Sequence, residues 1–307
     1  MSGHSSVTEF ASSVAQGRRF AGSALSDYWA LTKPEVNFLI LITTFVGFYL
    51  GCGSEARTFS FLSLFNTLLG TLLVASGTGT LNQYIEREFD AQMRRTARRP
   101  AAAGRLKPAA VLTFGIVLAV TGSIYLAIAA NLLASLLAIL TLLTYLFVYT
   151  PLKRKTPLCV LVGAFPGAMP PLIGWAAASG RLNVHAGVLY AILFLWQFPH
   201  FLAIAWMYRE DYSRAGILML PVVEPDGRVT AQQIVVYTLL LLPVSLLPTA
   251  LGISGKVYLY GAIVLGLLFL FSSLRAAFSK SRQEARRLLL ASVIYLPLLF
   301  ILMVLDR

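Results

Sequence analysis

Residues 109–150 have the sequence AAVLTFGIVLAVTGSIYLAIAANLLASLLAILTLLTYLFVYT and contain no charged side chain. An apolar run of about 18 or more residues is long enough to cross a hydrocarbon core of about 30 Å as a helix. The stretch is long enough for two such helices, at 109–129 and 132–150, joined by little more than Asn131. It therefore predicts a chain that crosses a membrane and immediately crosses back.

Comparable runs recur from Val36 to the C-terminal end. Hydrophobic residues make up 57% of the 307 residues and charged residues only 12%, too few to cover a soluble surface. The predicted fold is all-α, a polytopic bundle of nine transmembrane helices. They are expected at 36–52, 61–81, 109–129, 132–150, 158–178, 187–207, 233–253, 257–274 and 288–305. Residues 31–307 would form this single domain, and the polar residues 1–30 a flexible cytoplasmic tail.

The basic residues predict how the bundle is oriented. With the N-terminus inside, 21 of the 25 Lys and Arg residues fall on the inner side. The outer side keeps Arg57, Arg181, Lys256 and Arg307. Cytoplasmic loops carry this kind of Lys and Arg excess, so the pattern favours a cytoplasmic N-terminus. The formal charge of +12 is then explained by loops that face a membrane surface, and nucleic-acid binding is not expected.

The end of the second predicted span carries three oxygen-bearing side chains four residues apart, Asn82, Glu86 and Asp90. On a helix each is offset by only about 40° from the last, so they line one face. Carboxylates and a neutral oxygen suit Mg²⁺ and leave room for substrate phosphate. Arg94, Arg95, Arg98 and Arg99 follow at once and could bind phosphate oxygens. The alternative is that these acids and arginines only pair with each other and with lipid.

A second acidic position follows the sixth predicted span, where Glu210 and Asp211 are adjacent. His200 precedes Asp211 by eleven residues, so on one continuous helix the two would share a face roughly 16 Å apart. An ionisable residue that deep in a span usually faces a cavity or the bundle interior. Pro199 could kink the helix just before it. The alternative for His200 is a hydrogen-bonded packing residue.

At these positions the chain resembles the protohaem IX farnesyltransferases, also called haem O synthases, which are intramembrane prenyltransferases. The resemblance covers most of the chain and is carried by six segments in a fixed order. These are Asn82-x3-Glu86-x3-Asp90 running on to Arg99-Pro100; Leu31-Thr32-Lys33-Pro34; Tyr149-Thr150-Pro151-Leu152-Lys153-Arg154; Gly167-Ala168-Met169-Pro170-Pro171; Trp196-Gln197-Phe198-Pro199-His200; and Asp211-Tyr212-x-Arg214-Ala215-Gly216.

The resemblance implies a farnesyl transfer from farnesyl diphosphate to a vinyl group of haem b, in a multi-pass protein of the cell inner membrane. Mg²⁺ would be held by Asn82, Glu86 and Asp90, and Asp211 would join the catalytic group. The leaving diphosphate would be bound by basic side chains, and the allylic cation would form in a cavity that excludes water. The implied diphosphate-binding residues are Arg95, Arg99, Lys153 and Arg154.

Two departures from the wider prenyltransferase pattern favour haem as the acceptor. Glu86 stands where that superfamily usually has Asp, and Asp211 lacks the spaced aspartates of a full second motif. The haem branch resembles this chain in both features. The resemblance then suggests that His200, Trp196 and Tyr208 border the haem pocket, with His200 as a candidate iron ligand. Downstream haem-modifying or oxidase-assembly proteins are possible partners.

Two other functions stay open at this point. One is a prenyltransferase of the same fold that acts on a quinone or lipid acceptor. The other is a transporter of an anionic solute, which would more often show broken helices. The segment Gly163-x3-Gly167-x2-Pro170-Pro171 in the fifth predicted span is the one patch of that kind.

Overall fold

The computed structural model describes residues 24–53 and 59–307. Within these ranges the chain is helical, without a strand, and nine helical segments are long and apolar enough to span a membrane. Six are single helices: α3 (Pro34–Gly51), α4 (Phe61–Asp90), α5 (Pro108–Ala129), α10 (Val184–Met207), α13 (Arg228–Ala250) and α14 (Lys256–Ser279). A seventh is α15 (Arg282–Leu305). The predicted all-α, nine-span fold is confirmed.

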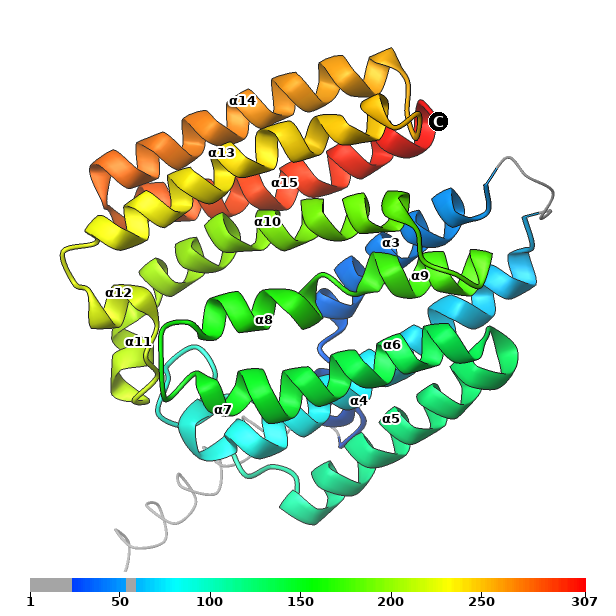
Figure 1. The fold of residues 1–307 in the computed structure, drawn as a ribbon. Coiled ribbons are helices and arrows are strands. Elements are labelled where there is room, and N and C mark those ends of the chain that lie inside the picture. Colours follow the sequence, from blue (N-terminus) through cyan, green and yellow to red (C-terminus); the bar gives the residue numbers. More distant parts are fainter. Residues whose placement is uncertain (1–23, 54–58) are drawn as a thin grey trace, which may run out of the picture.

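The other two segments are composite. The fourth, Leu132–Leu152, joins α6 (Leu132–Leu143) to the π-helical turn η1 (Thr144–Tyr149) and the short α7 (Thr150–Leu152). The fifth, Cys159–Ser179, is divided into α8 (Cys159–Gly167) and α9 (Pro170–Ser179), visible in Figure 1 as two separate ribbons. Pro170 and Pro171 explain the break, because neither can donate a backbone hydrogen bond to the preceding turn.

The helices form two groups that meet along the middle of the molecule. In Figure 1 α13, α14 and α15 lie together, and α10 packs against α13 and α15. On the other side of α10 lie α8 and α9, with α3 packed on α9 and the α4–α5 pair beyond. The α3–α9 contact is close because glycine faces backbone: a Cβ on Gly47 would lie 2.1 Å from the Pro171 carbonyl oxygen. Small residues at crossings of this kind are typical of membrane helices.

Part of the predicted N-terminal tail is helical. Residues 24–31 form α2 (Ala24–Leu31), whose Asp27 is buried and bonded to Arg105 in the loop before α5. Tyr28 packs edge-on against Phe114 of α5, with ring centroids 4.9 Å apart. The prediction of a flexible tail is therefore wrong for residues 24–30, because a buried ion pair and an aromatic contact hold them. Residues 1–23 lie outside the described residues.

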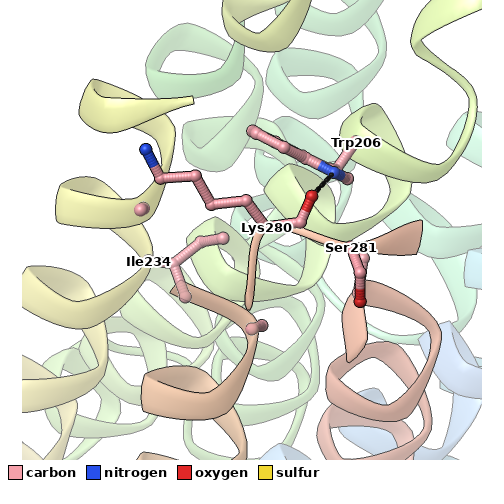
Figure 2. Close-up of a pocket in the computed structure, with 7 residues that line it drawn as sticks. Trp206, Ile234, Lys280 and Ser281 are labelled. Carbon is pink, nitrogen blue, oxygen red and sulfur yellow. Dashed lines mark hydrogen bonds between the residues drawn. The ribbon is translucent and has the colours of Figure 1, made fainter. Parts of the chain in front are cut away.

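The sixth span ends in a corner rather than continuing to Asp211. Helix α10 stops at Met207, Tyr208 has φ −114° and ψ 22°, and α11 (Arg209–Arg214) starts anew. Figure 2 shows the anchor of this end: the Trp206 indole N–H donates to the Lys280 carbonyl oxygen between α14 and α15, at 3.1 Å. The prediction that His200 and Asp211 share one face of a continuous helix is therefore wrong.

A short helix and a glycine complete the end of the bundle near this corner. The turn after α11 leads into the short α12 (Leu220–Val223), which packs on α10, α11 and α13. Gly227, with φ 69°, precedes α13 directly beside Trp206, where a Cβ would come within 1.8 Å of the indole ring. A side chain at position 227 would displace the tryptophan that anchors α10.

Candidate functional site

Three polar side chains line the last turns of α4, as their spacing predicts. Asn82 and Asp90 are each only 1% exposed, and Glu86 is partly buried between them. The Asn82 amide donates to Glu86 Oε2 at 2.9 Å and to Thr150 Oγ1 at 3.3 Å. We call Asn82, Glu86 and Asp90 the α4 ladder. Its donor set is one amide oxygen and two carboxylates.

Two lysines from different elements contact Asn82 and Glu86 of the α4 ladder. Lys33, in the turn between α2 and α3, donates from Nζ to Asn82 Oδ1 at 2.8 Å. Lys153, just after α7, donates to Glu86 Oε1 at 2.8 Å, in an ion pair whose two side chains are each 12% exposed. The ladder is thus the point where three segments far apart in sequence converge.

Asp90, the last residue of the α4 ladder, is bound by the loop that follows α4. Arg99 donates to Asp90 Oδ2 at 2.7 Å, and the Asp90 side chain is 2% exposed in this ion pair. Thr96 Oγ1 donates to the Asp90 carbonyl oxygen at 2.9 Å, which turns the loop back over the end of the helix. The arginine-rich loop therefore folds onto the ladder instead of extending into solvent.

The two lysines have opposite pKa shifts. Burial lowers the pKa of Lys33 to about 7, with a smaller contribution from the positive charge of Arg99. Burial also acts against the charge of Lys153, but the neighbouring Tyr149 and Glu86 raise its pKa well above the ordinary value. Lys153 is therefore a permanent cation beside its carboxylate, whereas Lys33 has no carboxylate partner of its own.

Arg95 joins the two acidic segments. Its backbone N–H donates to Asp211 Oδ2 at 3.2 Å, and its guanidinium donates to the Tyr212 hydroxyl at 3.3 Å. The same guanidinium lies 5.1 Å from the centre of the Tyr208 ring. Arg214 forms an ion pair with Asp211 from the other side. The structure thus brings Asp211 into the neighbourhood of the ladder through the loop after α4.

Arg154 and the segment after α11 close this end of the site. The Arg154 guanidinium lies 4.1 Å from the centre of the Phe89 ring on α4, so it is oriented by a cation–π contact. The Leu218 N–H donates to the Lys153 carbonyl oxygen at 2.8 Å, which joins the α7–α8 loop to the chain after α11. All four predicted diphosphate-binding residues therefore lie on the loops that cover the ladder.

The residues predicted for the acceptor pocket fall into two places. Trp196 and His200 on α10 stack on each other, with ring centroids 4.6 Å apart, and both contact Ser292 on α15. His200 Nδ1 lies 2.8 Å from Ser292 Oγ, and Trp196 donates to the Ser292 carbonyl oxygen at 2.9 Å. Tyr208 lies instead beside Arg95, in a separate cluster with Phe198 and Met219.

Sequence reasoning gave no role to Lys33. It lies within the segment Leu31-Thr32-Lys33-Pro34, but its partner Asn82 is 49 residues away and no spacing rule links them. Tyr212 was also missed as a partner of Arg95. The one signal that could have found Lys33 is its position, since it is a basic residue at the very start of a span.

The donor chemistry of the ladder fits a hard divalent cation that also binds substrate oxygens. Within residues 24–53 and 59–307 no three His, Cys, Asp or Glu side chains lie close enough to enclose an ion by themselves. Mg²⁺ commonly takes only one or two carboxylates from a protein and completes its octahedron with waters and phosphates. Glu86, Asp90 and the Asn82 oxygen match that incomplete protein contribution.

The chain is similar to known proteins over most of its length. Residues 40–301 match the UbiA prenyltransferase family. The protein named Protoheme IX farnesyltransferase in Solibacter usitatus is 52% identical, over 92% of this chain and 99% of its own length. The chain belongs to the protohaem IX farnesyltransferase branch of the UbiA prenyltransferase family. The resemblance inferred from the sequence motifs is confirmed.

Further relatives agree. The Protoheme IX farnesyltransferase of Koribacter versatilis is 47% identical over 99% of both chains. Among solved structures, a digeranylgeranylglyceryl phosphate synthase matches with a TM-score of 0.75 at 17% identity, over 92% of this chain and 98% of that one. A UbiA homologue from Archaeoglobus fulgidus bound to GPP and Mg²⁺ matches with 0.62 at 16% identity, over 90% and 99%. These two structures share the fold.

Proposed function

We propose that this protein transfers the farnesyl group of farnesyl diphosphate to a vinyl group of haem b, which makes haem O. The observation that carries the proposal is the buried α4 ladder covered by basic side chains, in a chain 52% identical to a Protoheme IX farnesyltransferase. A diphosphate with a long apolar tail fits a polar site at the end of a membrane bundle, because its tail can stay among apolar helices.

The basic side chains would bind and stabilise the leaving diphosphate. Arg99 and Lys153 already lie against the ladder carboxylates, and Arg95 is held near Asp211 by its own backbone N–H. Arg154 is positioned by the Phe89 ring. Charges fixed in advance cost little reorganisation when negative charge develops on the leaving group. Asp211 orients this group through Arg95 and Arg214.

Mg²⁺ bound by Asn82, Glu86 and Asp90 would supply Lewis-acid neutralisation of the diphosphate. The chain's own part is to exclude water from the allylic cation that remains and to present aromatic rings to it. Tyr149, Tyr208, Tyr212 and Phe198 pack around this end of the bundle in one cluster. Aromatic faces stabilise cations, so these rings can support the allylic cation while the cluster keeps water away.

The acceptor distinguishes the proposal from a quinone or lipid prenyltransferase of the same fold. The branch to which the chain belongs favours haem b, and His200 and Trp196 are the proposed border of its pocket. The broken fifth span, a feature more common in transporters, has a local cause here in Pro170 and Pro171. Gln197 Nε2 on α10 donates to the Ala164 carbonyl oxygen at 3.2 Å and so holds α8 near the break.

A product assay tests the proposal directly. Purified protein is incubated with haem b, farnesyl diphosphate and Mg²⁺, and the porphyrin product is identified by mass. The expected product is a haem that has gained a farnesyl group and a hydroxyl. Prenylation of an added quinone precursor with unchanged haem would support the alternative acceptor. The proposed setting is the cell inner membrane with the active face cytoplasmic, where haem-modifying or oxidase-assembly proteins would take the product.

A further inference from the structure

Lys33 has a backbone conformation that side-chain-bearing residues rarely adopt. Its φ of 52° and ψ of 61° are left-handed, and it is one of two such non-glycine residues within 24–53 and 59–307. It also precedes Pro34, which disfavours the right-handed helical conformation for the residue before it. A strained position persists only where its surroundings determine it, and such positions cluster at functional sites.

The turn that carries Lys33 is fixed to α4 on both sides. Before it, the Leu31 carbonyl oxygen accepts from Gln83 Nε2 at 3.0 Å and from Thr80 Oγ1 at 3.3 Å. After it, Asn37 Nδ2 on α3 donates to Ser76 Oγ on α4 at 2.8 Å and to the Thr32 carbonyl oxygen at 2.7 Å. The base of the Lys33 side chain therefore has a fixed position relative to the ladder, while its long stem leaves the amine free to change partner.

The partner of Lys33 is an atom that the proposed function needs for another purpose. Asn82 Oδ1 accepts the Lys33 amine at 2.8 Å, whereas the Asn82 amide nitrogen faces Glu86 and Thr150. That oxygen would be the neutral metal ligand of the ladder. An amine donates this hydrogen bond whether protonated or neutral, and in both forms it would compete with a metal for the Asn82 oxygen.

The charges of the site indicate where the amine goes when the metal arrives. Three carboxylates face five basic side chains: Glu86, Asp90 and Asp211 against Lys33, Lys153, Arg95, Arg99 and Arg214. The group is therefore rich in positive charge before a divalent cation enters. Lys33 contacts the Asn82 amide and no carboxylate, whereas Lys153, Arg99 and Arg214 each form an ion pair with one. The Lys33 amine can therefore move to a diphosphate oxygen without breaking an ion pair.

We propose that Lys33 is a positioning and diphosphate-binding residue that donates to the metal-ligand oxygen of Asn82 while no metal is bound and moves to a diphosphate oxygen when the metal takes its place. The inference rests on the proposed function and deepens it. Lys33 then makes the binding of metal and the binding of diphosphate depend on each other. It competes with a metal that binds alone, and it adds a hydrogen bond to a diphosphate that binds with the metal.

Substitution of Lys33 by methionine tests the exchange, because the two ligands should respond in opposite directions. In purified Lys33→Met, Mn²⁺ alone should bind about three- to tenfold more tightly than in the wild type, because one competing hydrogen bond is gone. Inorganic pyrophosphate with EDTA should bind about tenfold or more weakly, because a charged hydrogen bond is lost. A merely structural defect would weaken both. Lys155→Met removes an exposed lysine on the same side and should change neither.

A second measurement uses the wild type and does not depend on folding of a variant. Amine-reactive labelling followed by mass spectrometry should show Lys33 more reactive with Mn²⁺ alone and less reactive with pyrophosphate. Unchanged Lys33 labelling with Mn²⁺, or weaker Mn²⁺ binding in Lys33→Met, would overturn the exchange. The proposed function has its own test. Wild-type protein that binds neither Mn²⁺ nor pyrophosphate, or that forms no haem O, would contradict the proposed function itself.

Discussion

Glu86 and Glu88 are two positions apart on α4 but have different surroundings. The Glu86 side chain is 12% exposed and paired with Lys153, whereas that of Glu88 is 72% exposed and paired with Arg87. Glu86→Gln removes a proposed metal ligand and leaves the buried Lys153 without its counter-charge. We expect it to lower the rate of farnesyl transfer about a hundredfold or more while the protein remains folded.

Glu88→Gln is the matched control, with the same substitution on the same helix. Its rate should stay within about twofold of the wild type, because an exposed ion pair contributes little. Asp90→Asn, which removes the partner of Arg99, should resemble Glu86→Gln. Rates are measured in detergent with titrated Mg²⁺. Near wild-type turnover in both ladder variants would refute the metal assignment.

Two hydrogen-bond partners compete for the Ser292 hydroxyl beside His200. Ser292 Oγ lies 2.6 Å from the Leu289 carbonyl oxygen and 2.8 Å from His200 Nδ1. When the hydroxyl hydrogen is donated to Leu289, Ser292 accepts from His200 Nδ1, and the lone pair of the neutral ring is then on Nε2. An imidazole held by a hydrogen bond on one nitrogen is the usual arrangement when the other nitrogen ligates a metal. The same contact also satisfies a histidine that only packs.

Two substitutions separate these interpretations of His200. If it ligates haem iron, His200→Ala should weaken haem binding about tenfold or more and shift the Soret band, with farnesyl diphosphate affinity unchanged. Ser292→Ala, which leaves the ring without its orienting partner, should change haem affinity in the same direction but less. Haem titration followed in the Soret region measures both. A wild-type spectrum and affinity in His200→Ala would assign the residue to packing between α10 and α15.

At the scale of the helices, the sequence predicts what is local and misses what depends on distant contacts. The nine spans follow from the length of apolar runs, and the α4 ladder from four-residue spacing, because both lie within one helix. Helix α2 was missed since eight residues, two of them buried, carry no span signal. The corner at Tyr208 was missed because the Trp206 anchor comes from the chain 74 residues later. Pairing of Lys33 with Asn82 needs the fold itself.

Helix α2 gives a prediction about an element rather than a site residue. Asp27 is 5% exposed and its pair with Arg105 holds α2 over the start of α5, while the turn after α2 carries Lys33. Asp27→Ala leaves Arg105 unpaired and should lower the free energy of unfolding by roughly 2 kcal/mol, less than for a fully buried pair because Arg105 is partly exposed. It should also raise the KM for farnesyl diphosphate.

Thermal unfolding in detergent and steady-state kinetics measure these two effects of Asp27→Ala. Glu35→Ala, an exposed acid in the first turn of α3, is the control and should change neither. Full retention of stability and KM in Asp27→Ala would show that α2 does not support the Lys33 turn. A lower stability with unchanged KM would separate the helix from substrate binding.

At the scale of the whole molecule, hydrogen bonds join the loops of each end into one layer. At one end the loop after α4 contacts α11 through Arg95, and Lys280 after α14 donates to the Asp226 carbonyl oxygen before α13 at 2.9 Å. At the other end the Gly255 N–H donates to the Asp306 carbonyl oxygen at 2.7 Å, and Arg307 donates to the Tyr49 carbonyl oxygen at 2.8 Å. Loops within one such layer must face the same side of the membrane.

The charge asymmetry between the two layers predicts which side that is. The layer that contains the site carries most of the Lys and Arg residues, and such loops stay in the cytoplasm. Reporters of membrane sidedness fused after Arg99, after Lys155 and after Arg228 should all report the cytoplasm, and one after Arg181 the opposite side. A single disagreement among the four would contradict the orientation. If the reporter after Lys155 differed from the one after Arg99, Lys153 and Glu86 would lie on opposite sides of the bilayer and could not be in contact. That result would contradict the proposed site as well as the orientation.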